Sequence, residues 1–254
     1  MIITSTKNET VKLLRSLKER SARRETGLHL IEGERLVFDA LISGVEPDTV
    51  LVESGAERIE KRLEGMGVPF IGVSRSVLEA VSDTKTPQGI AAAVKTPNTA
   101  PPPSYPENAL IVALDRLQDP GNLGTILRSA DAMGARAVIL GEGCTDPFSP
   151  KALRAAMGSA YHIPVYEGDL KAELLKLKGA GSTLICGHLA GSETLPEPSG
   201  GCTLVIGNEG SGVSDEIAEV CTLYRLKMFG RAESLNASAA ATIIMYELSR
   251  LMNG

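Results

Sequence analysis

The stretch of residues 204–213 constrains the fold of this chain more than any other segment. An apolar run breaks there into a turn that holds Gly207, Gly210, Gly212 and a single carboxylate, Glu209. Glycine adopts positive φ angles and has no Cβ, so a ligand can lie directly against the main chain of such a turn. The pattern predicts a strand that ends in a ligand-binding loop, with an ordinary tight turn as the alternative.

The known phosphate-binding fingerprints do not fit this loop. Asp215 stands where a dinucleotide-binding fold has its last glycine, and no Gly-Lys-Ser/Thr follows as in a Walker loop. An acidic residue that could bind a ribose is also missing at the usual distance after a first strand–helix turn. A nicotinamide- or nucleotide-dependent enzyme is therefore only a weaker alternative.

The chain divides at a proline-rich stretch, residues 96–108, which we expect to be an extended linker. Residues 1–95 alternate between helical and strand patterns and predict a small α/β domain. Residues 109–254 hold short apolar runs separated by helical stretches, which predicts a parallel sheet with crossover helices. The predicted strands are 29–33, 49–53, 68–73, 89–94, 109–114, 137–140, 183–187, 203–206 and 223–228, and the predicted helices are 10–18, 34–43, 58–64, 149–158, 169–178 and 236–252.

Two other segments carry polar residues near predicted loops. A turn leads into a helix with Asn122 near its N-terminus, and Arg128 follows six residues later, almost two helical turns on. Ser234 and Asn236 lie in a turn before the last predicted helix, which either of them could cap. That helix has an apolar face, formed by Ala239, Ala240, Ile243, Ile244 and Leu248, which fits either a core or a dimer interface.

In order and spacing, these residues and the 204–213 loop resemble the three motifs of the SpoU (TrmH-like) family of RNA ribose methyltransferases, within the SPOUT superfamily. The resemblance covers residues 109–254 almost end to end. It implies an α/β domain with a deep trefoil knot, a parallel sheet with helices on both faces, and a homodimer. It also implies an active site formed by Asn122, Arg128, Glu209, Ser234 and Asn236.

The same resemblance implies S-adenosylmethionine as the cofactor, held in a bent shape by main-chain groups around Gly207, Leu226 and Leu235. Gly210 and Met228 are expected beside them. His188 follows a predicted strand on the ligand side and is expected to approach the cofactor, although a loop histidine without a ligand role is the alternative. The implied reaction moves a methyl group to a ribose 2′-hydroxyl, which requires two aligned reactants.

The chemistry of the side chains suggests how they divide this work. A guanidinium keeps its proton and its charge in proteins, so Arg128 is a poor base and is better suited to stabilise a developing alkoxide or bind a phosphate. Glu209 is expected to organise its loop, because main-chain hydrogen bonds would lower its basicity; a general base is the alternative role. Ser234 and Asn236 are expected both to cap the last helix and to contact the substrate.

The first domain is expected to bind RNA. Residues 30–33, Leu-Ile-Glu-Gly, resemble the substrate-binding domain found in front of many SpoU enzymes, which implies an RNA partner, with ribosomal RNA favoured over transfer RNA. The net charge is −5, but residues 1–35 hold eight basic and five acidic residues, a net of +3 against −8 elsewhere. Arg23 and Arg24 are therefore a candidate RNA-facing cluster, which Arg154 and Arg231 could extend; a solvated helix end is the alternative.

Composition narrows the remaining classes of protein to which this chain could belong. The longest apolar runs fall short of the roughly 18 residues of a membrane span, and the N-terminus lacks a signal-peptide layout, so a cytoplasmic protein is expected. The four cysteines are scattered, and neither a metal site nor a disulfide is expected. A non-catalytic RNA-binding or ribosome-assembly protein with the same fold is the main alternative, although every motif residue is present.

Overall fold

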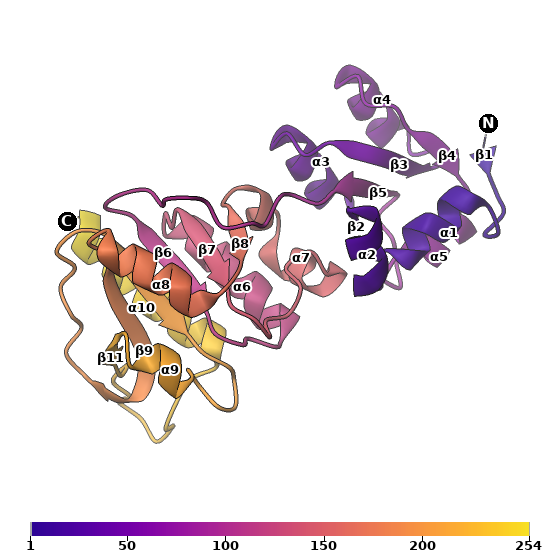
Figure 1. The fold of residues 1–254 in the computed structure, drawn as a ribbon. Coiled ribbons are helices and arrows are strands. Elements are labelled where there is room, and N and C mark those ends of the chain that lie inside the picture. The colour runs from indigo at the N-terminus through magenta and orange to yellow at the C-terminus, as the bar shows by residue number, and fades with distance from the viewer. Residues whose placement is uncertain (1, 254) are drawn as a thin grey trace. The chain divides into compact units, whose positions relative to one another are not determined.

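The computed structural model describes residues 2–253, which form two compact units (Figure 1). The first unit holds the residues up to Pro97 together with Phe148–Arg154. The second holds Asn98–Pro147 and the residues from Ala155 onward. Each unit is built around a β-sheet of its own.

The first unit is a mixed sheet with helices packed against it. Its strands are β1 (Ile2–Ile3), β2 (Leu28–Glu32), β3 (Pro47–Glu53), β4 (Ile71–Val73) and β5 (Ile90–Lys95), and its helices are α1 (Glu9–Ser16), α2 (Arg20–Thr26), α3 (Glu34–Ile42), α4 (Glu57–Gly65) and α5 (Arg75–Val81). The strand order is β1-β4-β3-β5-β2, with β5 antiparallel to both of its neighbours. Alternate residues of β5 face opposite sides, and its Ala91 and Ala93 pack with apolar residues of α1 and α5.

The second unit is an all-parallel sheet. Its strands are β6 (Leu110–Leu114), β7 (Ala137–Leu140), β8 (Val165–Glu167), β9 (Thr183–Ser192), β10 (Cys202–Ile206) and β11 (Thr222–Tyr224), and its helices are α6 (Pro120–Ala132), α8 (Leu170–Gly179), α9 (Asp215–Ala218) and α10 (Ala237–Asn253), with a 3-10 turn, η1 (Ser159–Tyr161). The helix α7 (Pro150–Ala156) spans the boundary between the two units. The strand order is β11-β9-β10-β6-β7-β8, and every pairing is parallel.

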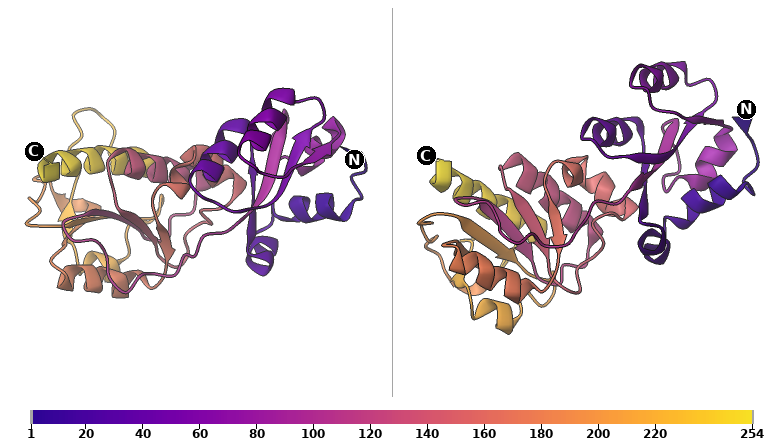
Figure 2. Two further views of the ribbon diagram at one scale, coloured as in Figure 1. Left: turned by 90° about the horizontal axis from the view of Figure 1, so that it is seen from above. Right: turned by 45° about the horizontal axis from the view of Figure 1, so that its top comes forward.

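Helices cover both faces of this parallel sheet. α6 and α10 pack on one face, and α8 and α9 pack on the other (Figure 2). Every residue of β6, β7 and β10 is buried, which is why these strands are continuous apolar runs. Parallel strands bring their carboxyl ends to one edge, so the loops after β6, β10 and β11 converge there. The predicted α/β class with a parallel sheet and a preceding small domain is confirmed.

Several short elements differ from the prediction. β1, α2, α5, β8 and α9 were not predicted, because runs of two to seven residues carry too little periodicity. The predicted strand 68–73 begins only at Ile71, after Pro69, which has no N–H for a ladder. The predicted strand 223–228 ends at Tyr224, because the following residues leave the sheet and line a pocket.

The proposed basic cluster at residues 23 and 24 needs correction at Arg23, whereas Arg24 is exposed and stays a prediction. Arg23 is buried, at 7% exposure, and its Nη1 donates to the carbonyls of Leu17 and Lys18, both at 2.7 Å. This guanidinium closes the end of α1 and does not face solvent. Arg154, which belongs to the first unit, forms ion pairs with Asp83 at 2.7 Å and Glu32 at 3.4 Å. Neither arginine therefore presents an open RNA-facing charge.

The beginning of the second unit is tied to its sheet and to α8. The amide of Glu167 donates to the carbonyl of Thr99 at 2.7 Å, and the hydroxyl of Tyr105 donates to Glu173 Oε2 at 2.8 Å. Residues 98–108 contain no helix or strand. Among the described residues, no helix is both long and apolar enough to cross a membrane.

Candidate active site

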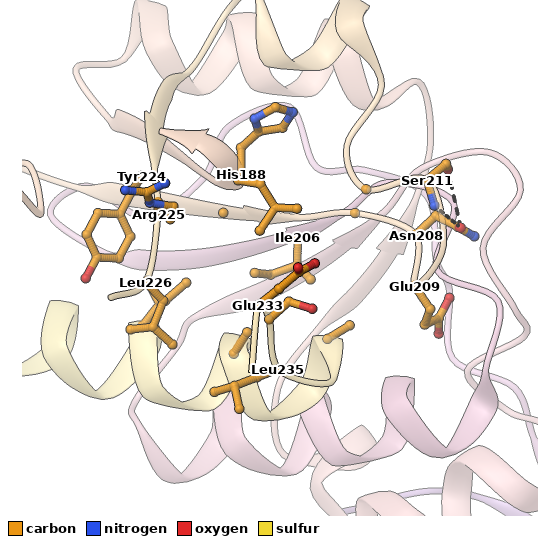
Figure 3. A pocket seen from close by; sticks show the side chains of 18 of the residues that line it. His188, Ile206, Asn208, Glu209, Ser211, Tyr224, Arg225, Leu226, Glu233 and Leu235 are labelled. Carbon is orange, nitrogen blue, oxygen red and sulfur yellow. Dashed lines mark hydrogen bonds between the residues drawn. The ribbon is translucent and has the colours of Figure 1, made fainter. Parts of the chain in front are cut away.

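A pocket of about 360 Å³ opens at the carboxyl edge of the parallel sheet. Its walls come from residues 187–189 of β9, from the 206–212 loop after β10, and from the segment between β11 and α10. It is lined by all six residues predicted to bind the cofactor, namely His188, Gly207, Gly210, Leu226, Met228 and Leu235. Figure 3 shows Glu209 near one end of this pocket, beside Asn208 and Ser211, and Leu226 toward the other end.

Close packing of the main chain shapes the glycine loop. A Cβ added to Gly207 would lie 2.2 Å from the carbonyl carbon of Gly212 and from the nitrogen of Val213. Only glycine therefore fits at position 207 without a backbone shift. Asn208 and Gly212 pair through two main-chain hydrogen bonds, of 3.0 and 2.9 Å, which close the loop.

The side chain of Asn208 holds this loop from inside. Its Oδ1 accepts hydrogen bonds from the amides of Gly210 at 2.9 Å and Ser211 at 3.1 Å. Its Nδ2 donates to the carbonyl of Arg116, 2.9 Å away in the loop after β6. Asn208 therefore fixes the shape of the glycine loop and joins it to the neighbouring loop.

Glu209 makes the second connection between the two loops. Its Oε1 accepts from the amide of Asp119 at 2.9 Å and from Asn122 Nδ2 at 3.0 Å, and its Oε2 accepts from the amide of Gln118 at 3.2 Å. Partial burial raises the pKa of the carboxyl, but the hydrogen bonds from Asn122, Asp119 and Gln118 together outweigh it. The pKa of Glu209 therefore lies below its ordinary value, and the group is an anionic clamp and a weak base.

Asn122 extends this network to the start of the last helix. Its Oδ1 accepts from Asn236 Nδ2 at 3.0 Å and from Ser238 Oγ at 3.3 Å. Asn236 in turn caps α10, because its Oδ1 accepts from the amide of Ser238 at 2.9 Å. Three segments of the sequence thus meet through Glu209, Asn122 and Asn236.

Asp115 provides a third connection between the two loops. This carboxylate is 5% exposed at the end of β6, and its Oδ2 accepts from the amide of Ser214 at 2.7 Å. Ser214 precedes α9, so the far end of the glycine loop is also held. The side chains of Asn208, Glu209 and Asp115 together connect both ends of this loop to the β6–α6 loop.

Two residues predicted to be catalytic lie outside the network. Ser234 lines the pocket in an exposed position. Arg128 is exposed on α6, is not among the residues that line the pocket, and makes no hydrogen bond or ion pair to it within the described part of this chain. Six residues of helix separate Arg128 from Asn122 by about 9 Å along the axis.

The predicted site did not include Asn208, Ser238 or Asp115. Each had a signal: Asn208 and Ser238 lie within the recognised motifs, and Asp115 directly follows an apolar strand. Asparagine and serine occur so often in ordinary turns that type alone does not distinguish them. Of the residues described, no group of His, Cys, Asp and Glu could hold a metal ion.

The pocket is suited to S-adenosylmethionine. Ile206, Leu226, Leu235 and Ile244 give it apolar walls, and the glycines of the 206–212 loop expose main-chain groups. His188 Nδ1 accepts from the amide of Ala190 at 3.2 Å, which leaves Nε2 to carry the proton of a neutral ring. When bound, the cofactor supplies an activated methyl group. The chain supplies the walls and the fixed loops around it.

Comparison with known proteins agrees with this site. The SpoU rRNA Methylase family matches residues 109–246, and the MRM3-like substrate binding domain matches residues 8–92. The fold, the site and these matches define an S-adenosylmethionine-dependent RNA ribose 2′-O-methyltransferase. The chain belongs to the SpoU rRNA methylase family.

Individual relatives share both units of the chain. The 23S rRNA (guanosine(2553)-2′-O)-methyltransferase RlmP of Bacillus subtilis is 39% identical over 97% of this chain and 98% of its own length. The AdoMet-bound rRNA methyltransferase of Sinorhizobium meliloti has a TM-score of 0.87 and 34% identity, covering 98% of this chain and 97% of that one. The SpoU methyltransferase AviRb of Streptomyces viridochromogenes, in complex with AdoMet, has a TM-score of 0.84 and 28% identity, covering 96% of this chain and 98% of that one.

Proposed function

We propose that this chain methylates the ribose 2′-oxygen of a guanosine in 23S rRNA, at the position equivalent to that of the Bacillus subtilis relative. The similarity to that relative runs through both units, including the segment that matches a substrate-binding domain. The observation that carries the proposal is the Glu209–Asn122–Asn236 network beside a pocket suited to the cofactor. Because ribosomal RNA is its substrate, we also propose that the protein works in the cytoplasm.

Four side chains have separate roles in the proposed methyl transfer. Methyl transfer breaks the sulfur–carbon bond, whose electron pair stays on the sulfur, forms an oxygen–carbon bond and releases the hydroxyl proton to water. Glu209 holds the loops in register, because its lowered pKa makes it a poor acceptor for that proton. Arg128 stabilises the developing alkoxide or binds a neighbouring phosphate, because a guanidinium keeps its charge. Ser234, which lines the pocket, and Asn236, which belongs to the network beside it, contact the RNA.

We further propose that the working unit is a homodimer. Arg128 lies outside the pocket lining of its own chain, and α10 carries the exposed apolar side chains Ile243, Tyr246 and Leu251. Symmetric dimers are the commonest assembly of soluble oligomers. In such a dimer, the Arg128 of one protomer would serve the pocket of the other.

Methyl transfer into unmodified 23S rRNA tests the reaction and the target. Labelled methyl from S-adenosylmethionine should appear in 2′-O-methylguanosine at a single site with the natural chain, and should be lost with Arg128→Ala. Cofactor affinity should stay within about twofold in that variant, because Arg128 does not line the pocket. Cofactor binding without label in any RNA would favour a non-catalytic RNA-binding protein, and label at another nucleotide would reject the proposed target.

Mixing two inactive variants tests the shared site. Arg128→Ala and Glu209→Ala protomers, unfolded together and refolded as a mixture, should regain up to about half of the natural activity per mixed dimer, because one of its two pockets is intact. A sedimentation measurement gives the assembly state independently. A monomer at working concentration, or a mixture without activity from folded dimers, contradicts the shared site.

A further inference from the structure

The first unit contains a hollow of about 470 Å³ between α3 and α4, outside the active site. It is lined by Glu34, Arg35, Phe38, Ile42, Arg58 and Arg62, among others, and is called here the α3–α4 hollow. Its volume falls in the range of ligand sites, about 300 to 1,000 Å³. Three guanidiniums and two carboxylates, those of Glu34 and Asp39, therefore line one concave surface, with a net positive charge.

Two of these guanidiniums are held in place by a single carboxylate. Glu34, the first residue of α3, forms ion pairs with Arg58 and with Arg62, the latter at 3.6 Å. The side chain of Glu34 is only 19% exposed, whereas those of Arg58 and Arg62 are 78% and 45% exposed. The carboxylate therefore orients two cations that still face solvent.

An aromatic ring fixes the second guanidinium further. Arg62 Cζ lies 3.8 Å from the ring centroid of Phe38, and Phe38 itself is 1% exposed. A guanidinium has five N–H donors in one plane, so stacking and one ion pair leave donors for a second acceptor. A planar fork of this kind matches the oxygens of a phosphate.

Three other arginines of the first unit bond to protein acceptors. Arg23 donates to two main-chain carbonyls, and Arg154 pairs with two carboxylates. Arg75 bonds to Glu53 and to Glu79, each at 3.0 Å. In the α3–α4 hollow, by contrast, Arg58 and Arg62 share Glu34.

An exposed apolar side chain lies beside these charges. Ile42, the last residue of α3, is 68% exposed and lines the same hollow. Aliphatic and charged groups side by side suit an RNA strand, which presents phosphates together with riboses and unstacked bases. A purely acidic partner would not need the apolar contact.

We propose that the α3–α4 hollow binds the sugar–phosphate backbone of the RNA substrate, with Arg35, Arg58 and Arg62 on phosphates and Ile42 against a ribose or base. This inference rests on the proposed function in one respect, since it requires an RNA substrate. It does not depend on which nucleotide is methylated.

Salt-dependent RNA binding by the full chain tests this site. The variants are Arg58→Gln, Arg62→Gln and the double variant, and Lys61→Gln is the matched control. Lys61 lies on the same helix, with a side chain 76% exposed, and does not line the hollow. The probe is an unmodified 23S rRNA transcript, titrated between about 50 and about 200 mM salt.

Each Arg→Gln change should weaken RNA binding by about tenfold and reduce the slope of log affinity against log salt by about one. Lys61→Gln should change the RNA affinity by less than about twofold and the salt slope by less than about 0.2. Cofactor affinity should be unchanged in every variant. Arg62→Lys keeps the charge, so it should keep the salt slope while losing part of the affinity. This variant separates loss of a phosphate contact from loss of the fold, and thermal unfolding of each variant checks folding directly.

Three results would overturn the inference. The first is that the folded double variant keeps the RNA affinity and the salt slope of the natural chain. The second is weaker binding with an unchanged slope, which would indicate a structural role for the arginines. The third is competition by poly-glutamate as strong as by RNA of equal charge, which would assign the hollow to an acidic protein partner. If the natural chain does not methylate 23S rRNA, but its binding to transfer RNA has a salt slope that depends on these arginines, the proposed target is rejected and the proposed RNA-binding role of the hollow is retained.

Discussion

Asn122 Nδ2 donates a hydrogen bond to Glu209 Oε1 at 3.0 Å, across 87 residues of sequence. The same Asn122 side chain accepts from Asn236, which lies 114 residues after Asn122 in the sequence. A neutral amide can do both at once, because it has a donor and an acceptor end. Asn122 is therefore the residue through which the three motif segments become one site.

Glu209→Gln should reduce the methyl transfer rate by about 10²- to 10³-fold. The glutamine amide has only one acceptor oxygen, so its NH2 group would face the donor of Gln118 or those of Asp119 and Asn122, and at least one of these contacts is lost. Single-turnover methylation measures the effect. Glu216→Gln, on a carboxylate that pairs with Lys171 on the surface, is the control and should retain the natural rate.

The glycine loop should loosen only when the pH falls below about 4.5. The pKa of Glu209 lies below its ordinary value of 4.5, so the carboxylate contacts are complete above about pH 4.5 and are lost as the pH falls through the folded-state pKa. The melting temperature of the natural chain minus that of Glu209→Gln should be constant between about pH 7 and about pH 5 and shrink below about pH 4.5. A difference that already shrinks near pH 6 would contradict a lowered pKa.

Asn208→Ala should weaken cofactor binding by about tenfold, the equivalent of roughly 1.4 kcal/mol. The change removes acceptors for the amides of Gly210 and Ser211 and the donor to the Arg116 carbonyl. Titration calorimetry with S-adenosylmethionine measures it. Asn208→Asp keeps the acceptors and loses the donor, so its cofactor affinity should lie between those of the natural chain and Asn208→Ala. Equal affinity in the natural chain and both variants would show that the loop needs no support from this side chain.

Gly207→Ala should destabilise the second unit by about 1 to 3 kcal/mol and abolish cofactor binding, because the new methyl group overlaps the main chain at Gly212 and Val213. Gly179→Ala is the matched control: within the described residues nothing lies within 4 Å of its Cβ position, and its φ is not positive. That control should be neutral or stabilising by up to about 1 kcal/mol. Thermal unfolding and calorimetry compare the two, and an active, stable Gly207→Ala would refute the packing argument.

The short, continuous apolar runs predicted the parallel sheet, and the family resemblance implied that Asn122, Glu209 and Asn236 belong to one site. The sequence did not predict Ser238 or Asp115, whose roles depend on which loop lies opposite. Arg23 was wrongly predicted to face RNA, since an arginine near a helix end looks the same in sequence whether it faces water or donates to main-chain carbonyls. Arg58 and Arg62 were not predicted to bind a ligand, because the stacking of Arg62 on Phe38 and the carboxylate shared by both arginines exist only in the folded unit.

The pocket is assembled from β9, the glycine loop and the segment before α10, so it exists only when the sheet of the second unit is complete. A ligand that binds only the folded form adds about 2.7 kcal/mol to the free energy of unfolding at a hundredfold excess over its Kd. The described residues of the first unit contribute no wall to the pocket and gain no such protection. The supply of methyl donor therefore bears on the lifetime of the catalytic unit as well as on its turnover.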